Sequence, residues 1–221
     1  RSTRKVSSAA SDVYKRQVYD DDGLGRPPWA MSSPLLKEYY DTEWGLPIFE
    51  EAALYERLSL ESFQSGLSWA VVLKKREAFR AAFRNFDPDK VAEFDEADVE
   101  RLLGDASIIR NETKIRAAIN NAKATIALRE EGGLAEFIWA YQPPENLYPT
   151  VMEDIPKKSY ESKLMSRELK KKGFRFVGPV TCFALMEAIG MVDTHLLGSH
   201  RRGTSGAVSY THLRAHETRH D

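Results

Sequence analysis

Helical periodicity runs through the middle of the chain, from about Arg26 to Arg202. Apolar residues recur there every three or four positions, which places them on one face of an α-helix. Stretches that alternate apolar and polar residues, as half-buried strands do, are nearly absent. The longest periodic run carries Ile115, Ala118, Ile119, Ala122 and Ile126. This pattern predicts an all-α fold of short helices joined by tight turns, without internal repeats.

Capping residues locate several helix ends. Asp87, which precedes a proline, and Asp95 are each expected to begin a helix. Their short side chains can accept hydrogen bonds from the unpaired N–H groups of a first turn. Asn111 is expected to begin the long helix in the same way, and Gly132-Gly133 to end it.

A lone carboxylate, Glu61, stands on a helix face that is otherwise apolar. The helix is expected to begin near Glu50. Leu54, Leu58 and Glu61 are spaced four and three residues apart, so they share one face that points inward. A buried carboxylate without a partner is costly, so it either protonates or finds a partner. Glu61 is therefore expected to lie buried or to line a cavity.

The residues after Glu61 predict a tight turn and a second helix. Gly66 can end the first helix and Ser68 can cap the next, which places Trp69 in its first turn. A carboxylate and a large ring can then reach the same volume, which suits a flat ligand that is cationic or donates hydrogen bonds. Taken alone, the spacing favours the alternative, a salt-bridged glutamate at a helix end beside a core tryptophan.

Two further segments carry candidate chemistry. The aromatic stretch YYDTEWG (39–45) can supply stacking surfaces, or it can simply pack against the core. Helices are predicted over residues 166–172 and 179–188, joined by the glycine-bounded turn of KKKGFRFVG (170–178). Amides at the start of the second helix can hold a phosphate, and the lysines add counter-charge. The alternative is a solvated charged face. A loop with three prolines is predicted over residues 142–149.

Composition limits the classes of protein that the chain can be. It has 221 residues, 42% of them apolar, which is enough for a buried core and suits one domain, whether or not it has two lobes. Its single cysteine excludes an internal disulfide, so the cytoplasm is the expected compartment. No run approaches the roughly 18 apolar residues of a membrane helix, and no signal peptide is recognised. The net charge of −1 excludes reliance on overall basicity for binding nucleic acid, but not a local basic face.

The two ends of the chain are excluded from the predicted fold. Residues 1–25 and 204–221 lack sustained periodicity, and both resemble translated sequencing-adapter DNA, so we expect disordered, non-native tails. Three residues of the second tail, His212, His216 and His220, are spaced so that a helix would bring them to one face, as in a metal site. Because they lie in an expected tail, we assign no metal to them.

From Trp29 to about His195 the chain resembles the DNA-3-methyladenine glycosylase I family, of the helix-hairpin-helix DNA glycosylase superfamily. The resemblance depends on the order and spacing of six motifs. They are YYDTEWG (39–45), ESFQSGLSWAVVLKKREAFRAAF (61–83), FDPDKVAEF (86–94), DASIIRNETKIRAAINNAKA (105–124), KKKGFRFVG (170–178) and MVDTH (191–195).

The resemblance implies a fold and an activity for residues 26–203. The fold is a two-lobed all-α domain with a base pocket between the lobes and a helix-hairpin-helix motif that binds DNA. The activity is hydrolysis of the N-glycosidic bond of 3-methyladenine, flipped out of alkylated double-stranded DNA, without strand cutting. The implied protein is a cytoplasmic, nucleoid-associated monomer of base excision repair that has no contact with membranes. The chemistry requires neither a metal nor an organic cofactor.

The resemblance also implies roles for particular residues. Glu61 matches the pocket acid that accepts hydrogen bonds from the base, and Tyr39, Trp44 and Trp69 match pocket aromatics. Leu36 stands where the family has another pocket tyrosine, so that stacking contact is missing. Contacts with the DNA backbone are expected from Lys170, Lys171, Lys172, Gly173 and Gly178.

The chain departs from the family at a structural zinc site. Members commonly bind zinc through two cysteines and two histidines, but here the four positions hold Pro27, Tyr40, His195 and Ser199. One remaining ligand cannot form a closed tetrahedral site. His200 lies close in sequence, but the only thiol, Cys182, falls within a predicted helix elsewhere. We therefore expect no zinc and expect packing, around Trp29 and Tyr40, to replace it.

Asp193 is a second departure. In the wider superfamily an aspartate in a similar Val-Asp-Thr-His context stabilises the developing sugar cation, whereas this family is generally described as lacking it. Asp193 is therefore a candidate catalytic residue that acts electrostatically. The alternative is that it caps a final helix.

Two other functions remain open at this point. The first is a non-catalytic, glycosylase-like protein that binds DNA or lesions without cleaving them. The lost zinc ligands favour it slightly, but the retained pocket residues Glu61, Tyr39, Trp44 and Trp69 oppose it. The second is a helical bundle with packed aromatics that does not bind DNA.

Overall fold

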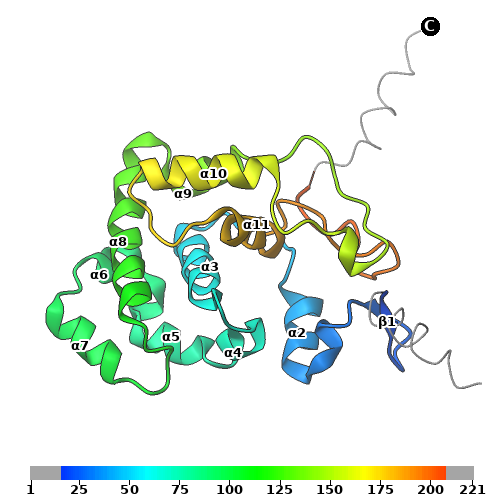
Figure 1. Cartoon of the computed structure of the whole chain (residues 1–221), viewed down its shortest axis with the longest axis horizontal. Helices are drawn as coiled ribbons and strands as arrows, with labels where there is room; N and C mark the ends of the chain where they lie inside the picture. The colour runs from blue at the N-terminus through cyan, green and yellow to red at the C-terminus, as the bar shows by residue number, and fades with distance from the viewer. Residues whose placement is uncertain (1–15, 208–221) are drawn as a thin grey trace, which may run out of the picture. The chain divides into compact units, whose positions relative to one another are not determined.

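The structure, a computed structural model, describes residues 16–207 and divides the chain into two compact units (Figure 1). Unit 1 is built from the chain up to Pro47, from Pro143–Pro156 and from the residues after Ile189. Unit 2 comprises Ile48–Gln142 and Lys157–Ile189. Both are mainly helical or irregular, which confirms the predicted all-α class. Within residues 16–207, every helix is too short or too polar to cross a bilayer.

Unit 1 has few regular elements and is held together largely by loops. Helix α2 begins where Ser33 accepts a hydrogen bond from the Leu36 N–H and Pro34 occupies the first helical position. The elements of unit 1 are β1 (Val18–Tyr19), which is antiparallel to β2 (Gly25–Arg26), the short 3₁₀ helices η1 (Ala30–Ser32) and η4 (Met152–Asp154), and α2 (Pro34–Thr42).

Unit 2 contains the remaining helices and the larger apolar core. Helix α8 packs against α3, α6, α7 and α9, and α11 packs against α3 and α10. Four rings, those of Phe63, Phe79, Phe83 and Phe86, pack together inside it. The elements are α3 (Glu51–Gln64), α4 (Trp69–Lys74), α5 (Arg76–Ala82), η2 (Arg84–Phe86), α6 (Pro88–Ala92), α7 (Glu96–Gly104), α8 (Glu112–Leu128), η3 (Arg129–Glu131), α9 (Gly133–Trp139), α10 (Tyr160–Lys171) and α11 (Pro179–Ala188).

Most predicted helix starts are confirmed by side-chain caps. The carboxylates of Asp87 and Asp95 and the amide of Asn111 each accept a hydrogen bond from the first turn that follows. Helix α10, in contrast, begins earlier than residue 166. Ser159 and Ser162 form a capping box there, in which each side chain accepts a hydrogen bond from the backbone of the other.

The expected tail boundaries need one correction. Strand β1 and the first residue of β2 lie inside residues 1–25, which the sequence interpretation excluded from the fold. Arg26, only 2% exposed, fixes this segment by hydrogen bonds to the carboxylates of Asp22 and Asp41. The segments 1–15 and 208–221, with the three spaced histidines, lie outside the described residues.

The Arg26 contacts predict a stability effect. Arg26→Met is expected to lower the free energy of unfolding by about 1–3 kcal/mol, because it leaves two carboxylates without their buried partner. Lys37→Met is the matched control, since Lys37 pairs with Asp20 at 32% exposure and such pairs contribute less than about 1 kcal/mol. Urea unfolding at pH 7 measures both variants, and equal midpoints would contradict a role for Arg26 in holding the segment.

Candidate active site

Glu61 lies on the buried face of α3, as its spacing predicts. Leu54 and Leu58 are fully buried on that face, and Glu61 is 6% exposed. Among residues 16–207, no group donates a hydrogen bond to its carboxylate. The alternative of a salt-bridged glutamate at a helix end therefore does not describe this side chain.

Burial changes the acidity of Glu61. Loss of water around the carboxylate raises its pKa to about 7, although the nearby positive charge of Arg57 opposes the change. Both protonation states are thus accessible at neutral pH. A buried acid whose pKa is shifted this far is a candidate for a functional site, as the sequence predicts for Glu61.

Trp69 begins α4, one turn after the end of α3. Gly66 adopts a positive φ of 82° in that turn, and Ser68 occupies the capping position without a side-chain hydrogen bond. The guanidinium of Arg57 lies 5.9 Å from the Trp69 ring centroid, over the ring, and its positive charge also acts on the Glu61 carboxylate. Sequence reasoning missed Arg57, yet it precedes Glu61 by four residues on the same helix, which is the signal that could have identified it.

The two other predicted pocket aromatics belong to unit 1. Tyr39 is buried on α2, and Leu36 is buried one turn earlier on the same helix. The Trp44 ring stacks on Tyr40 at 5.6 Å. Because Glu61 and Trp69 belong to unit 2, the convergence of all four pocket residues stays a prediction.

The predicted helix-hairpin-helix is formed by α10, a turn at Gly173–Gly178, and α11. Gly173 has a φ of 89°, and Phe176, unusual for a residue with a side chain, has a φ of 56°. Within residues 16–207, the N–H groups of 176–178 donate no hydrogen bond. They stand at the positive end of the α11 dipole, which makes the turn suitable for an anion.

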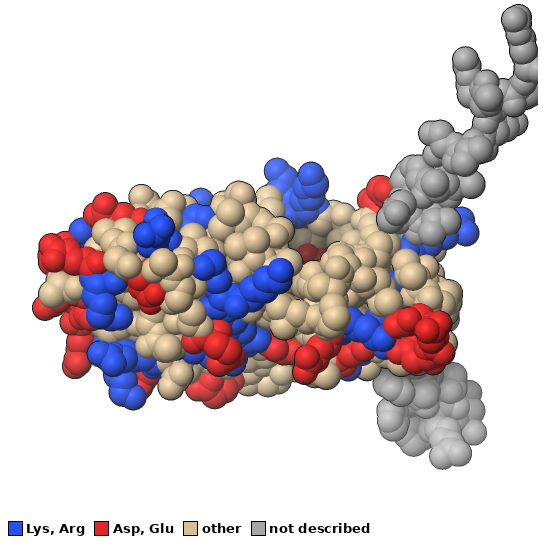
Figure 2. Space-filling model, turned by 90° about the horizontal axis from the view of Figure 1, so that it is seen from below, with Lys and Arg blue, Asp and Glu red and all other residues tan. Residues whose placement is uncertain are grey.

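The lysines before the turn are exposed, as expected for a DNA-binding segment. Lys171 and Lys172 form ion pairs with Glu168 and Glu131, whereas Lys170 has no ion-pair partner in the described part of the chain. On the face drawn in Figure 2, Lys and Arg side chains are interspersed with Asp and Glu. This mixture of charges agrees with the net charge of −1.

The four positions of the family zinc site do not form a zinc-binding donor set. The Tyr40 hydroxyl and the Ser199 hydroxyl share a hydrogen bond, and Pro27 offers no side-chain donor. His195 packs its ring against Tyr40 and Trp44. Burial lowers the pKa of His195, and although Asp193 opposes this, the positive charge of Arg201 adds to it. A hydroxyl pair and a nearby cation do not suit Zn²⁺, which needs thiolate, imidazole or carboxylate ligands.

Asp193 is buried, and both of its oxygens have partners. Oδ1 accepts hydrogen bonds from the backbone N–H and from Nδ1 of His195, and Oδ2 accepts one from the Gly203 N–H. Burial alone would raise the pKa of Asp193, but these hydrogen bonds outweigh it and hold the pKa below its ordinary value. No helix follows Asp193 up to residue 207, so the alternative of a cap on a final helix is wrong.

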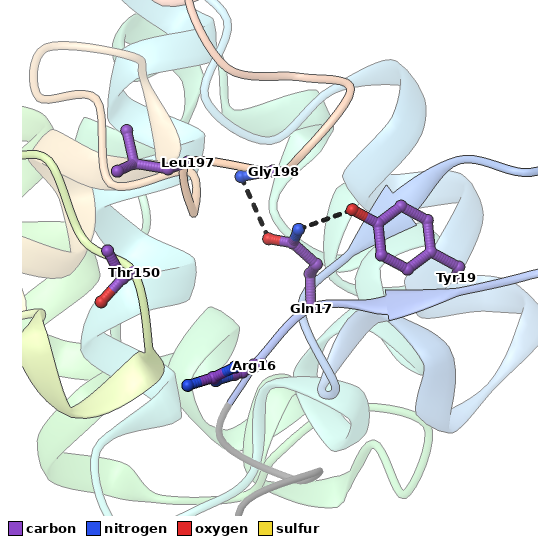
Figure 3. A pocket seen from close by; sticks show the side chains of 6 residues that line it. All are labelled: Arg16, Gln17, Tyr19, Thr150, Leu197 and Gly198. Atoms are coloured by element: carbon purple, nitrogen blue, oxygen red, sulfur yellow. Dashed lines mark hydrogen bonds between the residues drawn. The ribbon is translucent and has the colours of Figure 1, made fainter.

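A cavity of about 380 Å³ lies in unit 1, and none of the predicted catalytic or pocket residues is among its lining residues. Figure 3 shows the Gln17 side chain inside it, accepting a hydrogen bond from the Gly198 N–H and donating one to the Tyr19 hydroxyl. Its lining residues are Arg16, Gln17, Tyr19, Thr150, Leu197 and Gly198. This lining offers no acid, and its amide is already bonded, so we assign it no chemistry.

Known proteins resemble this chain in sequence. A family model described as methyladenine glycosylase matches residues 29–202. DNA-3-methyladenine glycosylase 1 of Escherichia coli is 43% identical over 79% of this chain and 95% of its own length. The DNA-3-methyladenine glycosylase of Haemophilus influenzae is 41% identical over 77% and 94%.

Solved structures agree with these matches. A crystal structure of 3-methyladenine DNA glycosylase I is 41% identical, with a TM-score of 0.75 over 77% of this chain and 96% of that one. A Tyr-to-Phe variant of such an enzyme, in complex with 3-methyladenine, is 33% identical, with a TM-score of 0.76 over 80% of this chain and 97% of that one. The chain belongs to the methyladenine glycosylase family.

Proposed function

We propose that this protein is a DNA-3-methyladenine glycosylase, which hydrolyses the bond between the methylated base and deoxyribose. The observation that carries the proposal is the Glu61 carboxylate, buried without a hydrogen-bond partner among residues 16–207. A fold stabilised only by packing would not keep such a group. A pocket for a cationic base needs it.

The chemistry of the substrate explains why one acid is sufficient. Methylation at N3 makes the adenine cationic, so the base is already a good leaving group and needs little general-acid help. Flipping it out of the stack costs a few kcal/mol, least for a damaged base. The ionised Glu61 then accepts hydrogen bonds from a positive ring in a site of low dielectric, where a neutral adenine gains less. Water attacks the sugar carbon through an oxocarbenium-like state.

The remaining pocket residues are assigned to stacking. Trp69 would lie against the flipped base, with Tyr39 and Trp44 completing the ring surfaces. Arg57 would hold the Trp69 ring in place and favour the ionised form of Glu61.

Double-stranded alkylated DNA is the proposed form of the substrate. The unpaired amides of residues 176–178 and the start of α11 would hold a backbone phosphate beside the flipped nucleotide. Lys170 would add counter-charge, so binding should weaken with salt. We propose that the protein acts as a monomer in the cytoplasm, at the nucleoid.

A non-catalytic lesion-binding protein is the second candidate. Loss of the zinc ligands is the observation that favours it. The buried, unpaired Glu61 opposes it, because a protein that binds only phosphate has no use for a carboxylate that burial destabilises. Release of free base from methylated duplex DNA separates the two.

Glu61→Gln is expected to reduce base release at least about 100-fold, because the amide cannot stabilise the positive ring as a carboxylate does. The wild-type kcat/KM should fall as the pH drops below about 7, where Glu61 takes up a proton, and Glu61→Gln should lose this dependence. The measurement is chromatography of bases released from methylated duplex DNA between pH 5 and 9.

An unfolding experiment on the same variant is the control. The folded-state pKa of Glu61 is raised from 4.5 to about 7, so the cost of its burial is absent below pH 4.5, grows between pH 4.5 and about 7, and stays constant above that. Glu61→Gln should therefore be more stable than wild type at pH 8, and equal to it near pH 4. Full base release by Glu61→Gln would overturn the proposed function.

Asp193→Asn separates a catalytic role from a structural one. Its hydrogen bonds to His195 and Gly203 favour the structural role, so the variant should lose about 1–3 kcal/mol of stability. The rate of base release at saturating enzyme should stay within about 3-fold of wild type, measured below the unfolding transition. A loss of 100-fold in a folded variant would instead support stabilisation of the sugar cation by Asp193.

We further propose that the family zinc is replaced by the Tyr40–Ser199 hydrogen bond and the rings around it. The donor chemistry of the four positions supports this proposal. A strong chelator should then leave both the melting temperature and base release unchanged. Metal analysis should find zinc far below one equivalent, and one tightly bound zinc per chain would contradict the proposal.

A further inference from the structure

Lys114, in the first turn of α8, is a buried cation with an unusual set of partners. It is 9% exposed, and its Nζ donates to the backbone carbonyls of Phe63 at 2.9 Å and Ser65 at 2.6 Å. Burial lowers the pKa of Lys114, and no carboxylate among residues 16–207 pairs with it. Its charge is therefore directed at two carbonyl groups, at the negative end of the α3 dipole.

Those carbonyls lie at the C-terminal end of α3 and at the start of the turn that leads to Trp69. Phe63 follows Glu61 by two residues inside α3, and Ser65 is the C-cap residue just after it. The side chains of residues 65–68 are exposed, so packing does little to fix this turn before Trp69 begins α4. In the described chain, Lys114 is the one side chain that hydrogen-bonds to the backbone of residues 63–68.

The same helix also holds the hairpin. Asn121 is 1% exposed; its Oδ1 accepts from the Arg175 N–H at 2.8 Å and its Nδ2 donates to the Arg175 carbonyl at 2.9 Å. The amide of Asn120 donates to the Gly173 carbonyl. Lys114 and Asn121 are seven residues apart, so they lie on one face of α8 and about 10 Å apart along it.

We propose that Lys114 is a positioning residue for base excision: it fixes the turn between Glu61 and Trp69 at a set distance from the hairpin that Asn121 holds. This inference rests on the proposed function.

Gly66 permits the turn because it can adopt a positive φ, but it does not select one backbone path. The ammonium group of Lys114 restricts that path further, because it is hydrogen-bonded to two backbone carbonyls. Because Ser62 ties α3 to the hairpin, displacement of the turn by an ångström moves Trp69 relative to Glu61 and to a base whose phosphate is bound at the hairpin. A misplacement of this size costs up to about 100-fold in rate.

The test compares Lys114→Met, which keeps the length and loses the donors, with Tyr55→Phe. Tyr55 is the matched control, because its hydroxyl donates to the Ala118 carbonyl and so also ties α3 to α8, but away from the turn. Single-turnover base release and the Kd for methylated duplex are measured for both. Lys114→Met should lower the rate about 10- to 100-fold with Kd within about 3-fold, and Tyr55→Phe should change neither by more than about 3-fold.

Lys114→Arg supplies the rescue, because a guanidinium also donates to carbonyls and should recover most of the rate. If Lys114→Met does not fold, Lys114→Gln, which keeps amide donors on a shorter side chain, takes its place with an intermediate loss expected. Equal rates for the Lys114 variants and Tyr55→Phe would overturn the inference. A Lys114→Met variant that binds methylated duplex more weakly but releases base at the wild-type rate would also overturn the inference.

A second readout does not depend on activity. Amide hydrogen exchange of residues 63–69 should accelerate in Lys114→Met and stay at the wild-type rate in Tyr55→Phe. If the wild type releases no base but this selective acceleration appears, the proposed function fails while the contact between Lys114 and the turn stands. If wild type is active and exchange of the turn is unchanged, the inference about Lys114 fails alone.

Discussion

Burial of the Glu61 carboxylate opposes folding at neutral pH, and the rest of unit 2 is arranged so that the group stays buried. Its helix is enclosed by α8, α9 and α11, and its own leucines are fully buried. A partner that neutralised the charge would remove the destabilisation, but it would also occupy the oxygens to which the proposed function assigns a cationic base. The positive charge of Arg57 lowers the free-energy cost of ionising Glu61, although Arg57 forms no ion pair with that carboxylate.

Polar side chains act together with core packing to position the turn after α3 and the turn before α11. Residues 65–68 are exposed and have few apolar contacts that could hold them, whereas the second turn buries Phe174 and Val177. Ser62, next to Glu61, donates to the Phe176 carbonyl, and Ser166 donates to that of Val177. The acid and the hairpin are therefore connected by directional hydrogen bonds, which fix an orientation that apolar contacts leave free.

Features that depend on nearby residues were predictable from the sequence, and features that join distant segments were not. The helix caps at Asp87, Asp95 and Asn111 can be recognised from the few residues around each one. The burial of Glu61 can likewise be predicted from the spacing of the leucines before it. The Tyr40–Ser199 and Lys114–Ser65 hydrogen bonds join residues 159 and 49 positions apart, so no local pattern signals them. The β1–β2 pair was missed for the same reason: its anchor, Arg26, is hydrogen-bonded to Asp41, 15 positions further along the chain.

The zinc positions show how such distant contacts can change together. A tetrahedral site requires all four ligands, so once one is lost the others keep little of their metal affinity. Tyr40 and Ser199 then contribute more as a hydrogen-bonded pair between α2 and the C-terminal segment than as separate, incomplete ligands. His195 retains a use of its own, because Asp193 binds its Nδ1 and its ring packs on Trp44. Gly45 belongs to the same arrangement, since a Cβ there would lie 2.5 Å from the His195 ring. In this proposal the histidine persists for packing reasons that remain after the metal is gone.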